Sequence, residues 1–259
     1  MMFARLSRLS RLSRLPGGPA RNAFQAGALV AVLALAACAS PSSRFYTLGG
    51  AIVGASGNTP AGASSVRTAA APAWLIEVAP IDVPPQVAKT QLVVQTGPTQ
   101  VKVLEEERWA SLPGDELRRA LSTSLTQQLN TIDVYGTAYS DTTPVYRVSV
   151  NVQRFESWPG SHALIDAVWS VRAVRSTAVM TCRSVVSEQV GSGYDSLVDG
   201  HRRALQRVSE QVAGALRAMA ASSASSGAAA AGASASQAKG AARVNVPACP
   251  SDGAAVAAG

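Results

Sequence analysis

The residues best suited to chemistry lie near the start of the chain, where positions 35–38 read Leu-Ala-Ala-Cys, a lipobox. They end an apolar run over residues 26–37, which follows five arginines. A basic region, an apolar region and small residues at a cleavage site, in that order, form a signal sequence. A cysteine directly after the cut takes a diacylglyceryl group on its sulfur, and fatty acids such as palmitate on its new amino group. We therefore expect residues 1–37 to be a lipoprotein signal peptide and Cys38 to be the lipidation site.

An ordinary secretory signal or a membrane-spanning anchor fits this segment less well. A secretory signal with an incidental cysteine does not account for the filling of all four lipobox positions. A membrane-spanning anchor needs about 20 apolar residues, and this run has roughly 12. Ala39 and Ser40 follow the cysteine, so the aspartate that commonly retains lipoproteins in the inner membrane of enteric bacteria is absent. The expected localisation is the outer membrane, with the protein lipid-anchored on the periplasmic face.

Reactive side chains elsewhere are few and scattered. The two histidines are His162, in a turn, and His201, in a helical pattern. Zinc sites need a cluster of such ligands, and none of the common nucleophile, metalloprotease, Walker or dinucleotide-binding motifs stands in a folded stretch. The sequence leaves open a Cys182–His201 pair, and Asp166 has no obvious partner carboxylate. We expect no catalytic residue, no metal site and no cofactor.

The net charge of +7 comes mostly from the signal segment. The whole chain carries 23 Lys and Arg against 16 Asp and Glu. Five of the arginines leave with the signal peptide, so the mature balance is 18 against 16, or +2. Binding to nucleic acid requires a basic patch on the folded part, and we expect no such partner.

Composition divides the mature chain into three segments. Residues 38–73 hold the lipidated N-terminus, a short strand at 44–48 and a flexible linker rich in Gly, Ala, Ser and Thr. Residues 74–220 are long enough for a single core. Residues 221–259 contain 28 Ala, Ser or Gly among 39, and we expect a disordered tail whose deletion leaves the thermal midpoint nearly unchanged. Whether Cys182 pairs with Cys249 stays open, because an oxidising periplasm permits a disulfide but a loose tail is a poor place for one.

The domain at 74–220 is expected to be α+β, with a mixed or antiparallel sheet packed by two main helices. Strand patterns cover 74–83, 91–96 and the half-buried stretch at 101–103. The strongest β signal is apolar alternation over 146–152, 163–173 and 177–189, which predicts a three-stranded antiparallel meander. An apolar face on such a sheet is expected to be covered by helices.

Leucines at every fourth position from Leu117 to Leu129 predict the first helix, with Pro113 near its first turn. The run Glu105–Trp109 is expected to lead into that helix, with Glu105–Glu107 as its solvated approach, and residues 131–135 are expected to form a short strand after it. The second helix follows Gly193 and keeps an apolar helical period to Met219.

Several stretches in a fixed order carry a resemblance. They are Arg-Phe-Tyr-Thr-Leu at 44–48, Val-Ala-Pro-Ile-Asp-Val-Pro at 78–84, Gln-Leu-Val-Val at 91–94 and Arg-Trp-Ala at 108–110. In this order, after a lipobox, they resemble the PqiC/YmbA (DUF330) family of ABC-type transport auxiliary lipoproteins. The resemblance implies a lipoprotein that positions the far end of a tunnel-forming MCE-domain protein in lipid transport between two membranes, without catalysis. It also implies a possible homo-oligomeric ring. The linker, the tail and residues 86–89 depart from the family pattern, so the transporter served stays open.

Within that picture the candidate partner-binding residues are Trp109 with Arg108, and the loop holding Pro84 and Pro85. Tryptophan and arginine are enriched at interface hot spots, and paired prolines present a rigid surface. The alternative for Trp109 is that it packs the first helix onto the sheet.

Two other functions compete with docking of a tunnel protein. A lipid-anchored periplasmic enzyme would need a pocket where His201, Cys182 or Asp166 converge. An assembly chaperone or pilotin for an outer-membrane secretion channel would co-purify with a secretin rather than with an MCE-domain protein.

Overall fold

The computed structural model describes residues 42–49, 71–232 and 248–250. The signal peptide, Cys38 and linker residues 50–70 lie outside the described residues. No helix in the described ranges is both long and apolar enough to cross a membrane. The described elements are β1 Arg44–Tyr46, β2 Leu75–Val78, β3 Gln91–Gly97, β4 Gln100–Trp109, α2 Pro113–Leu129, β5 Val145–Trp158, β6 His162–Ala173, β7 Val179–Gln189 and α3 Tyr194–Gly232.

The strands form two sheets, and the α+β fold class is confirmed. The smaller sheet has the order β1-β4-β3, with β1 parallel to β4 and β3 antiparallel to it. The larger sheet has the order β2-β5-β6-β7, with β2 parallel to β5. Strands β5, β6 and β7 are the antiparallel meander that the alternation predicts. The two sheets meet where β3 contacts β5.

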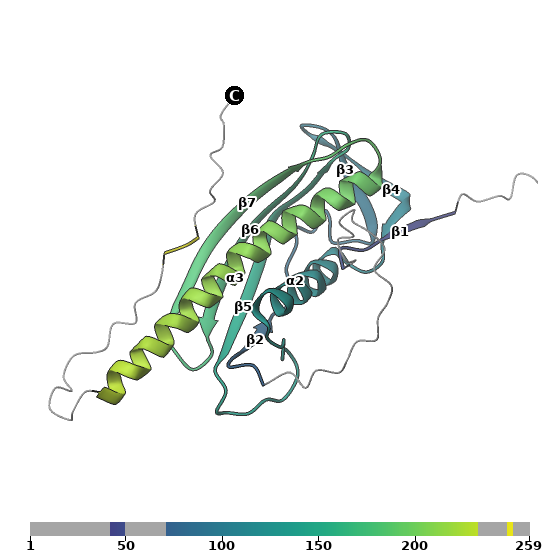
Figure 1. Ribbon diagram of the computed structural model, residues 1–259. Coiled ribbons are helices and arrows are strands. Elements are labelled where there is room, and N and C mark those ends of the chain that lie inside the picture. The colour runs from purple at the N-terminus through teal and green to yellow at the C-terminus, as the bar shows by residue number, and fades with distance from the viewer. Residues whose placement is uncertain (1–41, 50–70, 233–247, 251–259) are drawn as a thin grey trace, which may run out of the picture. The chain divides into compact units, whose positions relative to one another are not determined.

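Both helices pack against the larger sheet, α3 on the meander and α2 beside α3 near β2. Burial alternates strictly along β7, so that Met180, Cys182 and Val186 are buried between exposed neighbours. Helix α3 runs along β6 and β7, and α2 packs beside α3 (Figure 1). Leu117, Leu121 and Leu125 of the α2 stripe are buried, as their spacing predicts, and Leu129 is half-buried.

Gly200 allows α3 to approach the sheet closely. A Cβ at this position would lie 2.3 Å from Cγ1 of Val190 and 3.0 Å from Cβ of Ala163. Any larger residue would therefore push the first turns of α3 away from the sheet.

The segment Glu105–Trp109 is the end of β4, and the expectation of a solvated helix approach is wrong. It stays extended because β1 pairs with it along Glu107–Trp109. The expectation of a half-buried strand is also wrong for the first four residues of β4, all of which are exposed. Residues 131–135 form an isolated bridge between Asp133 and Ile76, and not the expected strand.

Helix α3 extends to Gly232, twelve residues past the expected end of the domain. Alanine, the best helix former, is frequent in this stretch. Further along, Cys249 forms a disulfide with Cys182 of β7, with 5.8 Å between the two Cα atoms. The expectation of a disordered tail is therefore wrong for residues 221–232 and for the segment 248–250. The remaining tail residues lie outside the described residues.

Candidate functional site: the fastening of the N-terminal segment

The segment that begins five residues after Cys38 is fastened to the domain by strand pairing and by side chains. Arg44–Tyr46 adds a parallel strand to the end of β4. The backbone N–H of Ala110 donates to the carbonyl oxygen of Tyr46 at 2.7 Å. The Ser43 hydroxyl donates to Glu106 at 2.9 Å. These contacts join the chain near its proposed lipid anchor to an element of the core.

Glu107 of β4 is the first of two buried carboxylates that hold this segment. Its oxygens accept hydrogen bonds from the Tyr46 hydroxyl at 2.6 Å and from Nε of Arg44 at 3.0 Å. Burial alone would raise the pKa of Glu107, but the bonds from Arg44 and Tyr46 outweigh it and hold the pKa below its ordinary value. Burial and the neighbouring carboxylate together raise the pKa of the Tyr46 hydroxyl. Glu107 is therefore ionised, and Tyr46 keeps its proton.

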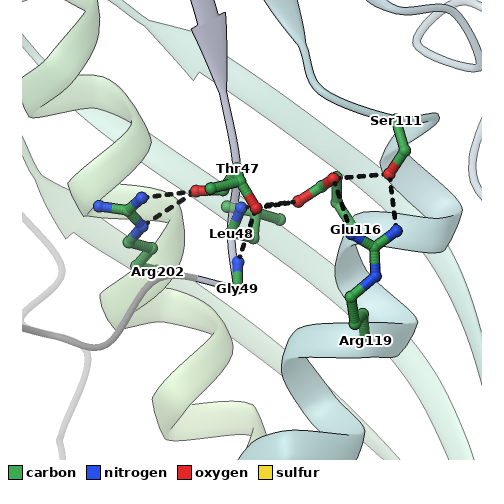
Figure 2. Close-up of polar contacts among 7 residues, drawn as sticks. All are labelled: Thr47, Leu48, Gly49, Ser111, Glu116, Arg119 and Arg202. Atoms are coloured by element: carbon green, nitrogen blue, oxygen red, sulfur yellow. Dashed lines mark hydrogen bonds and ion pairs between the residues drawn. The ribbon is translucent and has the colours of Figure 1, made fainter.

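Glu116, in the first turn of α2, is the second carboxylate and is fully buried. One oxygen accepts hydrogen bonds from the Thr47 hydroxyl at 2.6 Å and the Leu48 N–H at 2.9 Å. The other accepts from the Ser111 hydroxyl at 2.6 Å and lies 3.6 Å from Nη1 of Arg119 (Figure 2). Burial opposes ionisation here too, but these donors outweigh it, so the pKa of Glu116 lies below its ordinary value.

Helix α3 holds the same segment from the other side. The guanidinium of Arg202 donates two hydrogen bonds to the carbonyl oxygen of Thr47, at 3.1 and 2.6 Å. It also pairs with Asp199 at 2.8 Å. Figure 2 shows Thr47 lying between Arg202 of α3 and Glu116 of α2. We call Glu107, Glu116 and Arg202, with the residues 43–48 that they hold, the N-terminal clamp.

The clamp can transmit position and force, and its groups are not arranged for a reaction. Its two carboxylates are saturated with donors, and its arginines are paired. A surface pocket of about 480 Å³ lies beside it, lined by β1 and the first turns of α3.

Trp109, a candidate partner-binding residue, is only 2% exposed, so the expectation that it lies on the surface is wrong. Its ring packs against Phe155 of β5 and His201 of α3, with centroids 6.0 and 6.3 Å away. The residue belongs to the core because its side chain stands out from the sheet toward β5 and α3, where Phe155 and His201 cover the ring. Trp109 is a packing residue that joins the small sheet to β5 and α3.

The other three candidate residues lie near the start of β3. Pro85 is exposed and Pro84 is half-buried, in a turn closed by a hydrogen bond from the Val87 N–H to the Pro84 carbonyl at 3.0 Å. Arg108 is half-buried and donates from Nε to the Glu105 carbonyl at 2.8 Å. It pairs across the sheet with Gln91, the residue that ends the loop after the prolines. The fold thus places Arg108 and the proline loop at the same end of β3.

The three residues that the enzyme alternative depends on, Cys182, Asp166 and His201, each have a structural partner. Cys182 is in the disulfide. Asp166 accepts two hydrogen bonds from Arg183, at 2.9 and 2.7 Å, which hold its pKa below the ordinary value.

His201 is fully buried, with its Nε2 2.8 Å from the Ser157 hydroxyl and its ring stacked on Phe155. Burial lowers the pKa of His201 to about 3, so the ring is neutral at physiological pH. The Ser157–His201 pair has no access to a substrate, because both residues are buried.

Sequence reasoning misses the clamp residues. An acid in the first turn of a helix complements its positive end, so the sequence suggests only that role for Glu116, and it places Glu107 in a run expected to be solvated. One signal was available: Glu116 follows Pro113 by three residues and precedes Leu117, so it lies on the buried face of α2. A charged residue on a buried helix face needs a buried partner. Arg202 gives no such signal, because its partner is a backbone carbonyl.

The first of two solved structures that match this chain supports the fold. A crystal structure of an uncharacterized protein superposes with a TM-score of 0.51 at 18% identity, covering 67% of this chain and 97% of the other. A DUF330 protein from Xanthomonas campestris matches at 19% identity, with a TM-score of 0.40, over 56% of this chain and 85% of the other. No curated protein matches the sequence.

The sequence itself matches a family over residues 58–213, more than half of the chain. That family is described as the ABC-type transport auxiliary lipoprotein component. Its members are lipoproteins, which are held at a membrane by their lipid, and the matched region includes α2, the first half of α3 and every strand except β1. This chain belongs to the family of ABC-type transport auxiliary lipoproteins.

Proposed function

We propose that this protein is an outer-membrane lipoprotein, lipidated at Cys38, that docks the far end of an MCE-domain tunnel protein in lipid transport between the two membranes. The observation that carries this is the N-terminal clamp. A freely tethered domain would need no fixed contact with the segment after the lipid. Here residues 43–48 are bound by β4, α2 and α3. A docking subunit benefits from such coupling, because it holds its partner at a defined distance from the membrane.

The partner surface in this proposal lies at the start of β3 and comprises Pro85, in the loop before that strand, and Arg108 of β4. Both have solvent-accessible side chains, and neither contributes to the core. A rigid proline turn loses little conformational entropy on binding, and an arginine at an interface can supply several hydrogen bonds. Trp109 supports this surface from within and does not contact the partner.

Co-purification of the tagged, lipidated full chain from membranes tests the docking function. The Pro85→Ala/Arg108→Ala variant should recover at least tenfold less MCE-domain protein than the unchanged chain, since hot-spot truncation often costs about 2 kcal/mol or more. A matched control is Pro159→Ala/Arg172→Ala, an exposed proline and arginine elsewhere in the domain. Equal recovery with both double variants would refute this docking surface, and recovery of a secretin instead would identify a pilotin.

A further inference from the structure

One edge of β1 is open. The N–H of Ala110 donates to the carbonyl oxygen of Tyr46, so Tyr46 directs its backbone groups toward β4. Successive residues of a strand direct these groups to opposite edges, which turns the N–H and C=O of Phe45 and the C=O of Thr47 away from β4. The hydrogen bonds from Arg202 of α3 to the Thr47 carbonyl agree with this alternation (Figure 2). No strand among the described residues pairs with this edge.

The open edge faces the pocket of about 480 Å³ beside the clamp, which is a groove between a strand and a helix. One wall is β1, and the other is the start of α3, where Val198 is buried and Asp195 and Asp199 are exposed. Arg202 bridges the two walls where it donates to Thr47. A groove with an unpaired strand edge on one side can receive an extended polypeptide, which adds to the sheet as a further strand.

The groove carries one acid without an opposite charge. Asp199 pairs with Arg202, and Arg44 pairs with Glu107. The carboxylate of Asp195 has no ion-pair partner among the described residues. A chain that occupies the groove is therefore favoured by a lysine or arginine opposite Asp195.

The groove is continuous with the partner surface of the proposed function. Phe45 lies opposite Arg108 in the strand register, and Arg108 lies opposite Gln91 at the start of β3. Paired residues of neighbouring strands share a face of the sheet, and the strands lie about 4.8 Å apart. The side chain of Phe45, which is 67% exposed, therefore extends the surface of Pro85 and Arg108 toward the groove.

We propose that the open edge of β1 binds an extended segment of the partner as an added strand, paired with the backbone of Phe45 and carrying a basic residue opposite Asp195. This inference rests on the proposed function, in which the segment belongs to the docked tunnel protein. It adds a mode of recognition, backbone pairing beside the clamp. Because β1 has only three residues, the added strand is short and depends on the adjoining surface for affinity.

Replacement of Phe45 by proline or alanine tests the backbone contact. Both variants lose the exposed ring, but only Phe45→Pro loses the outward N–H, and neither loses a bond to β4. The lipidated full-chain variants are compared in their recovery of the MCE-domain protein from membranes. Phe45→Pro should recover at least about fivefold less than Phe45→Ala, because proline removes the donor and places ring atoms at the edge.

The thermal midpoints of the two Phe45 variants should agree within a few degrees. A much lower midpoint for Phe45→Pro would show that the fold uses the N–H and that the edge is not open. Equal recovery with Phe45→Pro and Phe45→Ala would refute the added strand and leave docking at Pro85 and Arg108 in place. Full recovery with Asp195→Asn would refute the basic residue. No recovery by the unchanged chain would refute the proposed function and this inference with it.

Hydrogen exchange on the unchanged chain gives a second measurement that needs no variant. In the chain alone, the Phe45 amide should exchange much faster than the Tyr46 amide, which faces β4. Addition of the purified MCE-domain protein should slow exchange at Phe45 at least tenfold. Slow exchange at Phe45 in the chain alone would show that the chain itself or a second copy already covers the edge, and would overturn the proposal.

Discussion

The described parts of the chain are fastened near both ends, but by different chemistry. Residues 43–48 are held by the N-terminal clamp, a set of hydrogen bonds and ion pairs centred on two buried carboxylates. Residues 248–250 are held by the Cys182–Cys249 disulfide, here called the C-terminal staple, and Pro250 lies near Gly214 of α3. The clamp depends on ionisation and on three elements being in place. The staple depends only on an oxidising environment.

The clamp and the staple also restrain different parts of the molecule. The clamp joins the chain near the proposed anchor to β4, α2 and α3 and so fixes how the domain is attached. The staple closes a loop that contains all of α3 and so restrains the helix that covers the meander. Acid should therefore weaken the first device, and reducing agents the second.

The largest effect is expected from the staple. Cys249→Ser should lower the free energy of unfolding by about 4 kcal/mol, because the disulfide closes a loop of about 67 residues. Urea unfolding with and without dithiothreitol measures this. The reductant should destabilise the unchanged chain by the same amount and leave the variant unaffected. A variant as stable as the oxidised chain would show that the staple restrains nothing.

The second largest effect is expected from acid, which should destabilise the core around His201. The pKa of His201 is about 3 when folded, against an ordinary value of 6.5. Its contribution to stability is complete above pH 6.5 and falls as the pH drops below that value, by about 1.4 kcal/mol per pH unit. The loss should reach about 2.7 kcal/mol at pH 4.5, and His201→Gln should remove this pH dependence. An unchanged slope in the variant would assign the acid sensitivity to other groups.

Removing one charge from the clamp should have a smaller effect. Glu116→Gln keeps the size of the side chain but weakens the bonds from Thr47, Leu48 and Ser111, for a loss of about 2 kcal/mol. Because the folded pKa of Glu116 is lowered, this contribution is present above pH 4.5 and is lost as the pH falls through the folded value.

The control for Glu116→Gln is Glu105→Gln, whose side chain is 67% exposed and which should change stability by less than about 0.5 kcal/mol. Combining Glu116→Gln with Cys249→Ser should give additive losses, since the two devices share no residue. A strong departure from additivity would show that clamp and staple are one unit.

The smallest effect is expected from Arg44→Ala. The Arg44 side chain is 58% exposed, so solvent screens its ion pair with Glu107 and the pair should contribute little to stability. Hydrogen exchange of residues 44–48 should nevertheless increase more than exchange in β7. The same increase in both regions would mean that Arg44 acts on the whole domain and not on the clamp alone.

The parts of the fold that depend on local sequence were predictable. Alternation over 146–189 specified the meander, and the leucine spacing specified α2, because each pattern repeats within one element. The end of β4 was not predictable from its own residues. Glu105–Glu107 is a run of acids that becomes a strand only because β1, about sixty residues earlier, pairs beside it.

The candidate site residues show the same limit: their local sequence predicts exposure for some of them, but packing by distant elements decides the rest. Pro84, Pro85 and Arg108 are accessible as expected, but Trp109 is in the core because β5 and α3 cover its ring. The sequence could not decide whether Cys182 and Cys249 form a disulfide, because the tail composition gives no sign of where Cys249 returns to the domain. Only the three-dimensional position of β7 beside residues 248–250 resolves it.

The hydrogen bonds from Arg202 to Thr47 have a consequence for the order of folding. The two residues are 155 positions apart, so the clamp cannot close until the start of α3 has been translocated. Until then the carbonyl oxygen of Thr47 lacks its donors from Arg202, and the long loop must close by diffusion, which makes this step slow. A chain lipidated at Cys38 would spend this interval held at a membrane surface. Its first strand would then be the first part to be positioned and among the last to become stable.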